Sequence, residues 1–480
     1  MTTVLFLAAI LAPAQPPAEW PCFGGSPARN MVAEQARNLP DTWDVRPGKE
    51  RNVLWSAKVG SHSFGGPVVS GGKVFVGTNN ESPRNLRDTK NGKPINKSVL
   101  MCFRAADGKF LWQHVNDKLP EPHSYDWPKF GICSTPFVDG ELLYYVTNRC
   151  EVVCLDVEGF ANGNQGVQDE QYRDPTDADV IWRFDMRKEL GVAPCRMSAS
   201  SPLVVGDLVY VITGNGVDVE TGQVAAPDAP SFLALDKKTG RVVWKDSSPG
   251  KGILHGQWSS PAYGLINGKL LLVFAGGDGK LRGFEPKTGR RLWEIDGNPP
   301  KTEAKFLNHF VATPMIANNC IFIGTGRNPE YDNGPGTLWA FSFAKGMPMV
   351  EWAKDNEFRN SNDRHFQPGR TISTCAAQGE FVYFAQLNGI VWCLEADTGF
   401  WAWEHNLKSP VWSSPLCADG KVYFATRDGD VYVFAAGREK KLLGKIEMGT
   451  PIVATPCAVD EVLYVLTDTQ LYALKRDAKK

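Results

Sequence analysis

The stretch Leu235-Asp-Lys-Lys-Thr-Gly240-Arg-Val-Val-Trp244 decides the fold, because the chain repeats its pattern twice more, at residues 284–293 and 394–403. Residues 108–112 repeat the Gly-to-Trp spacing in a weaker form. The pattern is typical of a hairpin, since an acidic residue and a threonine bond to the turn backbone and glycine takes the left-handed conformation. The tryptophan then falls at a constant place on the next strand. These copies predict a repeated β unit.

A second signature lies upstream of each hairpin: a Ser/Thr-Pro step, a short turn and an alternating strand. Eight equivalent positions follow one another along the chain, and Cys375 stands at the sixth, where proline is replaced: Pro67, Pro136, Pro202, Pro261, Pro314, Cys375, Pro415 and Pro456. Each unit has room for four short strands, and four-stranded units at this period are typical of propeller blades. We therefore expect an all-β chain that forms an eight-bladed β-propeller of four-stranded antiparallel blades over residues 53–476.

The ring needs an outer strand for its last blade. Residues 53–59 resemble such a strand and precede the first blade, so we expect this N-terminal strand to close the ring and leave no open sheet edge there. Seven tryptophans share the outer-strand position and are expected to dock between blades: Trp55, Trp112, Trp182, Trp244, Trp293, Trp352 and Trp403. The seventh blade lacks one.

Composition and the N-terminus limit the function classes. The chain has 52 Lys and Arg against 53 Asp and Glu, which excludes the basic surface of a general nucleic-acid binder. Residues 4–12 are apolar and precede Ala12-Pro13-Ala14, which predicts a signal peptide over residues 1–14. Residues 15–52 are then an extension over the propeller and 477–480 a tail. No later apolar run is long enough for a membrane span, so we expect an exported protein in the periplasm or cell envelope.

Eleven cysteines in an exported chain first suggest disulfides. The repeat favours another interpretation for most of them, because Cys102, Cys154 and Cys393 share a strand position that holds small residues in other units. We expect these three to be small buried side chains with reduced thiols. A bridge between Cys150 and Cys154 stays an alternative.

The Asp-x-x-Thr-Gly-x-x-x-Trp hairpin and its eightfold use resemble the tryptophan-docking repeats of pyrroloquinoline-quinone (PQQ) propellers. The opening Trp20-Pro-Cys-Phe-Gly-Gly-Ser-Pro-Ala-Arg29 also resembles exported bacterial propellers of this PQQ-binding-like superfamily. The resemblance implies the fold and two function classes. One is a quinoprotein dehydrogenase that oxidises alcohols or sugars with PQQ and calcium. The other is the non-catalytic propeller scaffold of the outer-membrane assembly machinery.

The residues favour the scaffold. The dehydrogenase family covers its quinone with an adjacent Cys-Cys pair, and this sequence has no adjacent cysteines. It has no Cys-x-x-Cys-His haem motif, and the family's catalytic Asp and its calcium ligands cannot be placed. We therefore assign no catalytic residue and no metal ligand, and we expect no cofactor. A PQQ- and calcium-dependent dehydrogenase stays the alternative.

The loops indicate which face binds. The turns between the first and second strands of the units are minimal, whereas long connections emerge at the opposite end, and elaborated loops commonly carry function. Several residues just before the first strands are expected to converge on the channel mouth there: Arg196, His255, Gln257, Trp258, Asn308, His309, Arg370 and Trp412. Apart from Asn308, these are the candidate ligand-binding residues. Their cations and rings suit an anionic or planar ligand. In the alternative interpretation, these side chains fill the channel mouth and bind no ligand. The partners we expect are envelope proteins or such a ligand.

Overall fold

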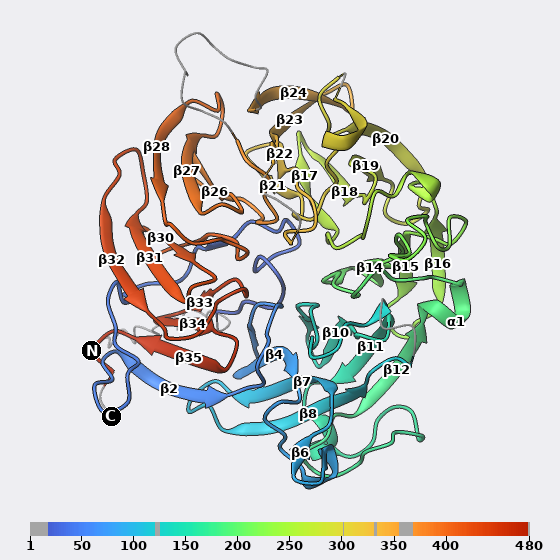
Figure 1. Ribbon diagram of the computed structural model, residues 1–480, viewed down its shortest axis with the longest axis vertical. Helices are drawn as coiled ribbons and strands as arrows, with labels where there is room; N and C mark the ends of the chain where they lie inside the picture. The colour runs from blue at the N-terminus through green and yellow to red at the C-terminus, as the bar shows by residue number, and fades with distance from the viewer. Residues whose placement is uncertain (1–17, 121–124, 301, 331–333, 355–367, 479–480) are drawn as a thin grey trace, which may run out of the picture.

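Eight blades of four antiparallel strands surround a central axis in the computed structural model, which describes residues 18–120, 125–300, 302–330, 334–354 and 368–478 (Figure 1). In the seventh blade a short fifth strand, β1 (Val32–Ala33), pairs parallel with the innermost strand. The predicted eight-bladed propeller is confirmed. In each blade the first strand lies at the hub and the fourth at the rim.

The first four blades take their strands in chain order. Blade one holds β3 (Val68–Ser70), β4 (Lys73–Asn79), β7 (Lys97–Arg104) and β8 (Phe110–Asp117). Blade two holds β9 (Phe137–Asp139), β10 (Leu142–Val146), β11 (Glu151–Asp156) and β12 (Val180–Asp185). Blade three holds β13 (Leu203–Val205), β14 (Leu208–Ile212), β15 (Phe232–Asp236) and β16 (Val242–Asp246). Blade four holds β17 (Ala262–Ile266), β18 (Lys269–Ala275), β19 (Lys280–Phe284) and β20 (Arg291–Asp296).

Three further blades follow the same plan and the eighth closes the ring. Blade five holds β21 (Met315–Ala317), β22 (Cys320–Gly324), β23 (Leu338–Ala344) and β24 (Met347–Lys354). Blade six holds β25 (Ala376–Gln378), β26 (Phe381–Ala385), β27 (Ile390–Glu395) and β28 (Trp401–Asn406). Blade seven holds β29 (Leu416–Ala418), β30 (Lys421–Ala425), β31 (Asp430–Ala435) and β32 (Leu442–Glu447). Blade eight holds β33 (Cys457–Val459), β34 (Val462–Leu466), β35 (Gln470–Lys475) and β2 (Val53–Lys58).

The N-terminal strand closes the ring as predicted. β2 pairs antiparallel with β35 and places Trp55 opposite Ala473, and the blue β2 lies beside the red β35 in Figure 1. Short elements decorate the connections: β1 (Val32–Ala33), β5 (Thr89–Lys90), β6 (Lys93–Pro94), α1 (Met186–Leu190), η1 (Leu86–Asp88), η3 (Gly159–Asn162), η4 (Gly250–Gly252) and η5 (Ala304–Phe306). Among the described residues no helix is long and apolar enough to cross a membrane.

The hairpin pattern has a packing reason that involves two blades. Trp182 of blade two donates its indole N–H to Lys237 O of blade three at 2.9 Å. Gly240 of that turn has φ +68°, and a Cβ there would lie 2.6 Å from the Trp182 ring. Glycine is therefore needed both for the turn and for the approach of the neighbouring indole. Five other outer-strand indoles also donate to a carbonyl of the next blade: those of Trp55, Trp112, Trp244, Trp352 and Trp403.

Trp293 differs because blade five joins its outer strands by the two-residue turn Lys345–Gly346. No described residue accepts a hydrogen bond from its indole N–H, and its ring packs on Phe343 with the centroids 5.5 Å apart. Trp339, which the repeat does not single out, instead donates to Gly297 O of blade four at 2.8 Å.

All eleven cysteines are free thiols, and ten of them are buried. The alternative Cys150–Cys154 bridge does not form. Burial raises the pKa of the Cys154 and Cys393 thiols to about 12, so both stay protonated at neutral pH. Both side chains pack within the apolar interior of the blades.

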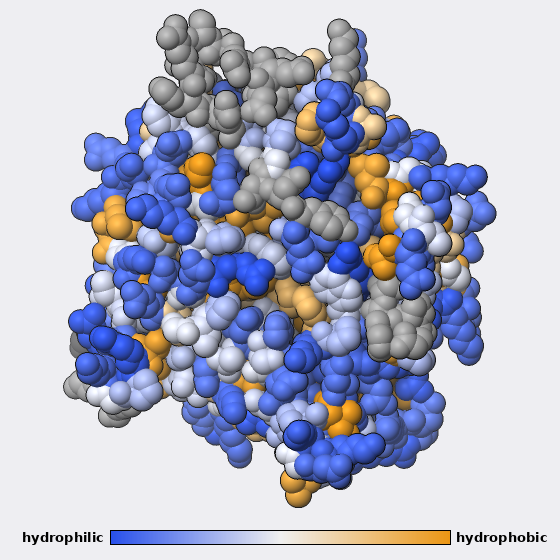
Figure 2. All heavy atoms as spheres, in the orientation of Figure 1, coloured by the Kyte–Doolittle hydropathy of each residue, from blue (hydrophilic) through white to orange (hydrophobic). Residues whose placement is uncertain are grey.

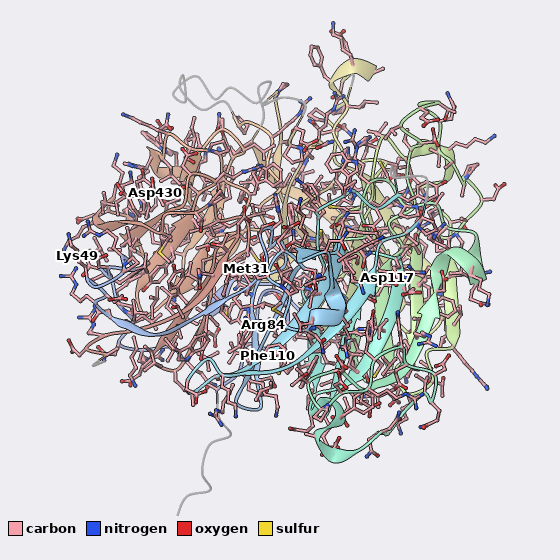
Figure 3. The ribbon with its side chains drawn as sticks, turned by 60° about the horizontal axis from the view of Figure 1, so that its bottom comes forward. Met31, Lys49, Arg84, Phe110, Asp117 and Asp430 are labelled. Carbon is pink, nitrogen blue, oxygen red and sulfur yellow. The ribbon has the colours of Figure 1, made fainter. Side chains whose placement is uncertain are left out.

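Residues 20–37, which we call the strap, cross the face opposite the long loops. The strap forms a hydrogen bond with the innermost strand of each of the eight blades, or with a residue next to that strand. The contacts follow the order of the blades along the chain, except that Arg29 reaches back to blade three. The blade residues in these contacts are Val69, Val138, Ser201, Tyr263, Ile316, Ala377, Cys417 and Asp460. Met31 accordingly lies near the middle of the molecule, whereas Lys49 lies at its edge (Figure 3). The strap thus ties the hub ends of all blades together.

Candidate functional site

Each blade enters its innermost strand through an extended segment whose side chains alternate in direction. The residue before the Pro position is Ser or Thr in blades two to eight, and it faces the central channel. The residue directly before this Ser or Thr points into the interface between blades, as Ser373 does when it donates a hydrogen bond to Ser413 O at 2.7 Å. The residue two positions before the Ser or Thr faces the channel again. Two stacked rings therefore line the channel.

The lower ring consists of seven hydroxyl groups. Each accepts a hydrogen bond from the backbone N–H at the equivalent position of the preceding blade, at donor–acceptor distances from 2.9 to 3.2 Å. All seven side chains are at most 8% exposed: Thr135, Ser201, Ser260, Thr313, Thr374, Ser414 and Thr455. The eighth position is Gly66, where a Cβ would lie 2.8 Å from Thr455 O. We call this set the hydroxyl ring.

The upper ring comes from the residues two positions earlier and is apolar. Its members are Phe64, Cys133, Ala199, Trp258, Val311, Ile372, Trp412 and Val453. We call this set the collar. Hydroxyl ring and collar together bound a cavity of about 170 Å³ on the propeller axis.

Aromatic and charged side chains form the mouth of this cavity. Phe130 stacks on Phe64 with the centroids 5.0 Å apart and contacts Trp127 edge-on. The Arg196 guanidinium lies 4.3 Å from the centroid of Trp127, within cation–π range. Arg196 Nη1 is also 3.7 Å from Glu330 Oε2. Arg196 and Glu330 are the charged members of the described cavity lining, so that lining has no net formal charge.

The strap closes the opposite end of the channel. Phe23 lines the cavity, and Arg29 is completely buried beside it. The Arg29 side chain donates to four backbone carbonyls, those of Pro261, Phe23, Ser201 and Pro202, at 2.8 to 3.1 Å. The cavity therefore opens toward the long-loop face.

The sequence-predicted mouth residues divide into two groups. Arg196, Trp258 and Trp412 line the cavity. His255, Gln257, Asn308, His309 and Arg370 are buried among the loops above blades three to six and are not among the described lining residues.

The second group bonds largely to the protein itself. Gln257 Nε2 donates to Asn215 O at 3.1 Å and to Ser231 Oγ at 2.9 Å. Arg370 Nε donates to Asn308 Oδ1 at 2.8 Å. These contacts brace the loops against one another. A role of the predicted residues in ligand binding stays a prediction.

Burial fixes the charge state of the two histidines. Burial, with a smaller contribution from Arg196, lowers the pKa of His255 to about 4. Burial, with contributions from His255, Arg327 and Arg370, lowers the pKa of His309 to about 3. Both imidazoles are therefore neutral at neutral pH. Burial and nearby Arg327 lower the pKa of Arg370 to about 10, so its guanidinium stays charged.

A second, polar cavity of about 300 Å³ lies at the rim between blades one and two. The insertion between β11 and β12 covers it and is pinned to blade one, because Arg87 pairs with Asp174 and Asp177. Lys97 pairs with Asp88 and contacts Tyr172 of the insertion. The described lining of this cavity holds more carboxylates (Asp117, Glu151, Glu170 and Asp177) than cations (Arg149 and Arg183).

Sequence reasoning missed the hydroxyl ring, the collar apart from Trp258 and Trp412, and the aromatic rim of Trp127 and Phe130. The signal for the two rings was present as the repeated apolar-x-Ser/Thr-Pro pattern, which served only to count blades. Trp127 and Phe130 lie in an irregular connection outside the repeat, so no periodic pattern marks them.

A family model described as outer membrane protein assembly factor BamB matches residues 166–357 and 330–477, which together span more than half of the chain. The chain belongs to this BamB-like propeller family. One curated relative, BamB of Legionella pneumophila (strain Paris), is 23% identical over 213 residues. That match covers 44% of this chain and 48% of the relative, so the chain spans about half the length of the relative it matches.

Solved structures share the fold at low identity. BamB from Moraxella catarrhalis superposes with a TM-score of 0.56 at 12% identity, over 89% of this chain and 98% of that one. Quinohemoprotein alcohol dehydrogenase from Comamonas testosteroni gives a TM-score of 0.63 at 12% identity, over 96% and 81%. At such identities the likeness concerns the fold alone.

The fold is therefore shared with proteins that use a quinone, and the residues can be compared with what PQQ and calcium need. Calcium takes six to eight oxygen ligands, yet within the described parts of the chain no three His, Cys, Asp or Glu side chains are placed to hold a metal ion. Glu330 is the acidic member of the described cavity lining, and it lies near Arg196. These residues do not fit a calcium-bound quinone, and we derive no redox step through one.

Proposed function

We propose that this protein is an exported, non-catalytic scaffold of the cell envelope, which binds envelope proteins through its long-loop face. Membership of the BamB-like family supports the class of function. The BamB name on its relatives refers to outer membrane protein assembly, and we extend that role to this chain as a hypothesis.

The asymmetry between the two faces supports the choice of surface. On one face, every turn between the first and second strands of the eight blades is two residues long, and the strap bonds to all eight blades. On the other face the connections are long and irregular, as between β8 and β9, β12 and β13, and β20 and β21. Long loops cost conformational entropy unless they contribute elsewhere.

The exposed surface suits reversible protein contacts. In the view of Figure 2, hydrophilic side chains predominate and hydrophobic ones are scattered. Interfaces of non-obligate complexes are about as polar as the rest of a protein surface.

Blade three offers a matched pair of probes, because it uses the same turn once on each face. Asp218 Oδ1 accepts bonds from the backbone N–H groups of Glu220 and Thr221 in the loop between β14 and β15. Asp236 Oδ1 does the same for Lys238 and Thr239 in the turn between β15 and β16. Thr221 and Thr239 are both exposed and lie at opposite ends of the blade.

A photo-reactive amino acid placed at Thr221 or at Thr239 therefore tests the proposal in cells that produce the chain. Adducts with envelope proteins from position 221, with few from position 239, are the expected result. Equal adducts from both positions, or none from 221 and from a second long-loop site at Lys305, would contradict a long-loop interface.

A further inference from the structure

The seven side chains of the hydroxyl ring are partnered on one side only. Each oxygen accepts a backbone N–H from the preceding blade. None of the seven donates a hydrogen bond to any described residue, although all line the same cavity and are at least nine-tenths buried. A hydroxyl can donate one hydrogen bond as well as accept. Seven buried donors therefore line the same cavity on the propeller axis.

The direction of the hydrogen bonds makes these groups good donors. An N–H that donates to a hydroxyl oxygen polarises the O–H and strengthens the bond that the O–H can donate in turn. Glu330 is the one carboxylate among the described lining residues, and it lies near Arg196 at the mouth. The floor of the cavity therefore favours a group rich in acceptor oxygens.

The walls favour an apolar body of limited size. The collar supplies eight apolar or aromatic side chains, and the cavity volume is about 170 Å³. An apolar protein cavity of about 150 Å³ is large enough to hold benzene. One six-membered ring fits this space, whereas ligand pockets for larger molecules measure about 300–1,000 Å³.

We propose that the channel cavity binds a small monocyclic carboxylate, with the carboxylate on the hydroxyl ring and the ring of the ligand within the collar. The ligand enters from the long-loop face, because Phe23 and Arg29 close the other end. This binding site is independent of the scaffold role proposed above.

Three probes of one size separate the parts of the proposal: benzoate, toluene and benzylamine, each titrated against the full chain by calorimetry and by ligand-detected NMR. Benzoate is expected to bind saturably at one site and more tightly than the other two. Toluene bound as tightly as benzoate would mean an apolar cavity without an acceptor site. Benzylamine bound as tightly, or no binding of benzoate, would likewise overturn the proposal.

Substitutions locate the site. Thr313→Val and Thr374→Val remove a hydroxyl from the ring at nearly constant volume, and each is expected to weaken benzoate binding about tenfold or more while changing toluene binding little. Ser373→Ala is the matched control, because Ser373 adjoins Thr374 and donates to Ser413 O instead of facing the cavity. Equal losses in Thr374→Val and Ser373→Ala would refute the hydroxyl ring as the site.

A third variant keeps the test decisive if the threonine variants fold poorly. Val311 belongs to the collar and is partly exposed to the cavity. Val311→Trp fills the cavity and is expected to abolish benzoate binding with the melting temperature unchanged. Undiminished binding by a folded Val311→Trp would place the ligand elsewhere.

Discussion

Arg29 offers the sharpest test of how the blades are held together. Its side chain is completely buried and donates to carbonyl oxygens of blade three (Ser201, Pro202), of blade four (Pro261) and of the strap itself (Phe23). Arg29 forms no ion pair with any described residue, and its guanidinium is surrounded by these carbonyl dipoles and the Cys22 thiol. Burial accordingly lowers the pKa of its guanidinium.

The expected cost of Arg29→Met follows from these contacts. Hydrogen bonds to a charged group contribute about 1.5–3 kcal/mol each, so four such bonds give roughly 6 kcal/mol or more. The desolvation of an unpaired guanidinium offsets part of this, and truncating one partner of a buried charged network costs about 3–5 kcal/mol. We therefore expect Arg29→Met to lower the free energy of unfolding by about 3–5 kcal/mol. Arg29→Lys should recover less than half, because an ammonium cannot reach carbonyls in two blades at once.

Urea unfolding followed by tryptophan fluorescence measures the loss, and hydrogen exchange at the inner strands of blades three and four locates it. Arg37→Ala is the control, since Arg37 is exposed on the same strap and surface changes usually stay within about 0.5 kcal/mol. The role of Arg29 in joining blades three and four would be refuted if Arg29→Met lowered the free energy of unfolding by less than about 1 kcal/mol. It would also be refuted if hydrogen exchange rose evenly in all eight blades.

Further outcomes follow from the same contacts. Trp244→Ala should cost about 3–5 kcal/mol in urea unfolding because Trp244 is buried and bonded to Pro286 O, whereas Trp401→Ala, at an exposed position, should cost under about 1. His255 and His309 have pKa values near 4 and 3 when folded against about 6.5 when unfolded, so stability should fall as the pH drops from 6.5 toward 4, and less steeply in His309→Gln. The buried thiols of Cys102, Cys154 and Cys393 should react with thiol reagents only after denaturation, and a disulfide at any of them found by mass spectrometry would contradict this. Alcohol- or sugar-dependent dye reduction should be absent after incubation with PQQ and calcium, and reduction that requires both would favour the dehydrogenase instead.

The parts of the fold that the sequence predicts are those that recur. The proline steps and the outer-strand tryptophans each recur in seven of the eight blades, so their spacing gives the number of blades, and the single unmatched strand at residues 53–59 gives the closure. Trp293 shows the limit of this reasoning. Its position is predicted, but its missing hydrogen bond depends on a shortened turn in the next blade, which no pattern within its own blade reveals.

The site is harder to predict because its residues meet across blades rather than along the chain. His255 and His309 were expected at the mouth since they precede innermost strands, yet the loop residues around them cover them. The strap is another example. Its order of contacts with eight blades depends on a path across a face, and neither composition nor periodicity of residues 20–37 encodes that path.

The hydroxyl ring connects a local sequence pattern with the contacts between blades. A Ser or Thr before proline is a local feature, and the residue before proline is restricted to extended backbone. Extended backbone at the hub directs that side chain toward the axis and its N–H toward the next blade, where the equivalent hydroxyl accepts it. The same residue type therefore fastens adjacent blades and lines the channel with donors. The contact between blades uses only the acceptor oxygen of each hydroxyl. The hydroxyl proton therefore remains available for a hydrogen bond to a ligand in the channel.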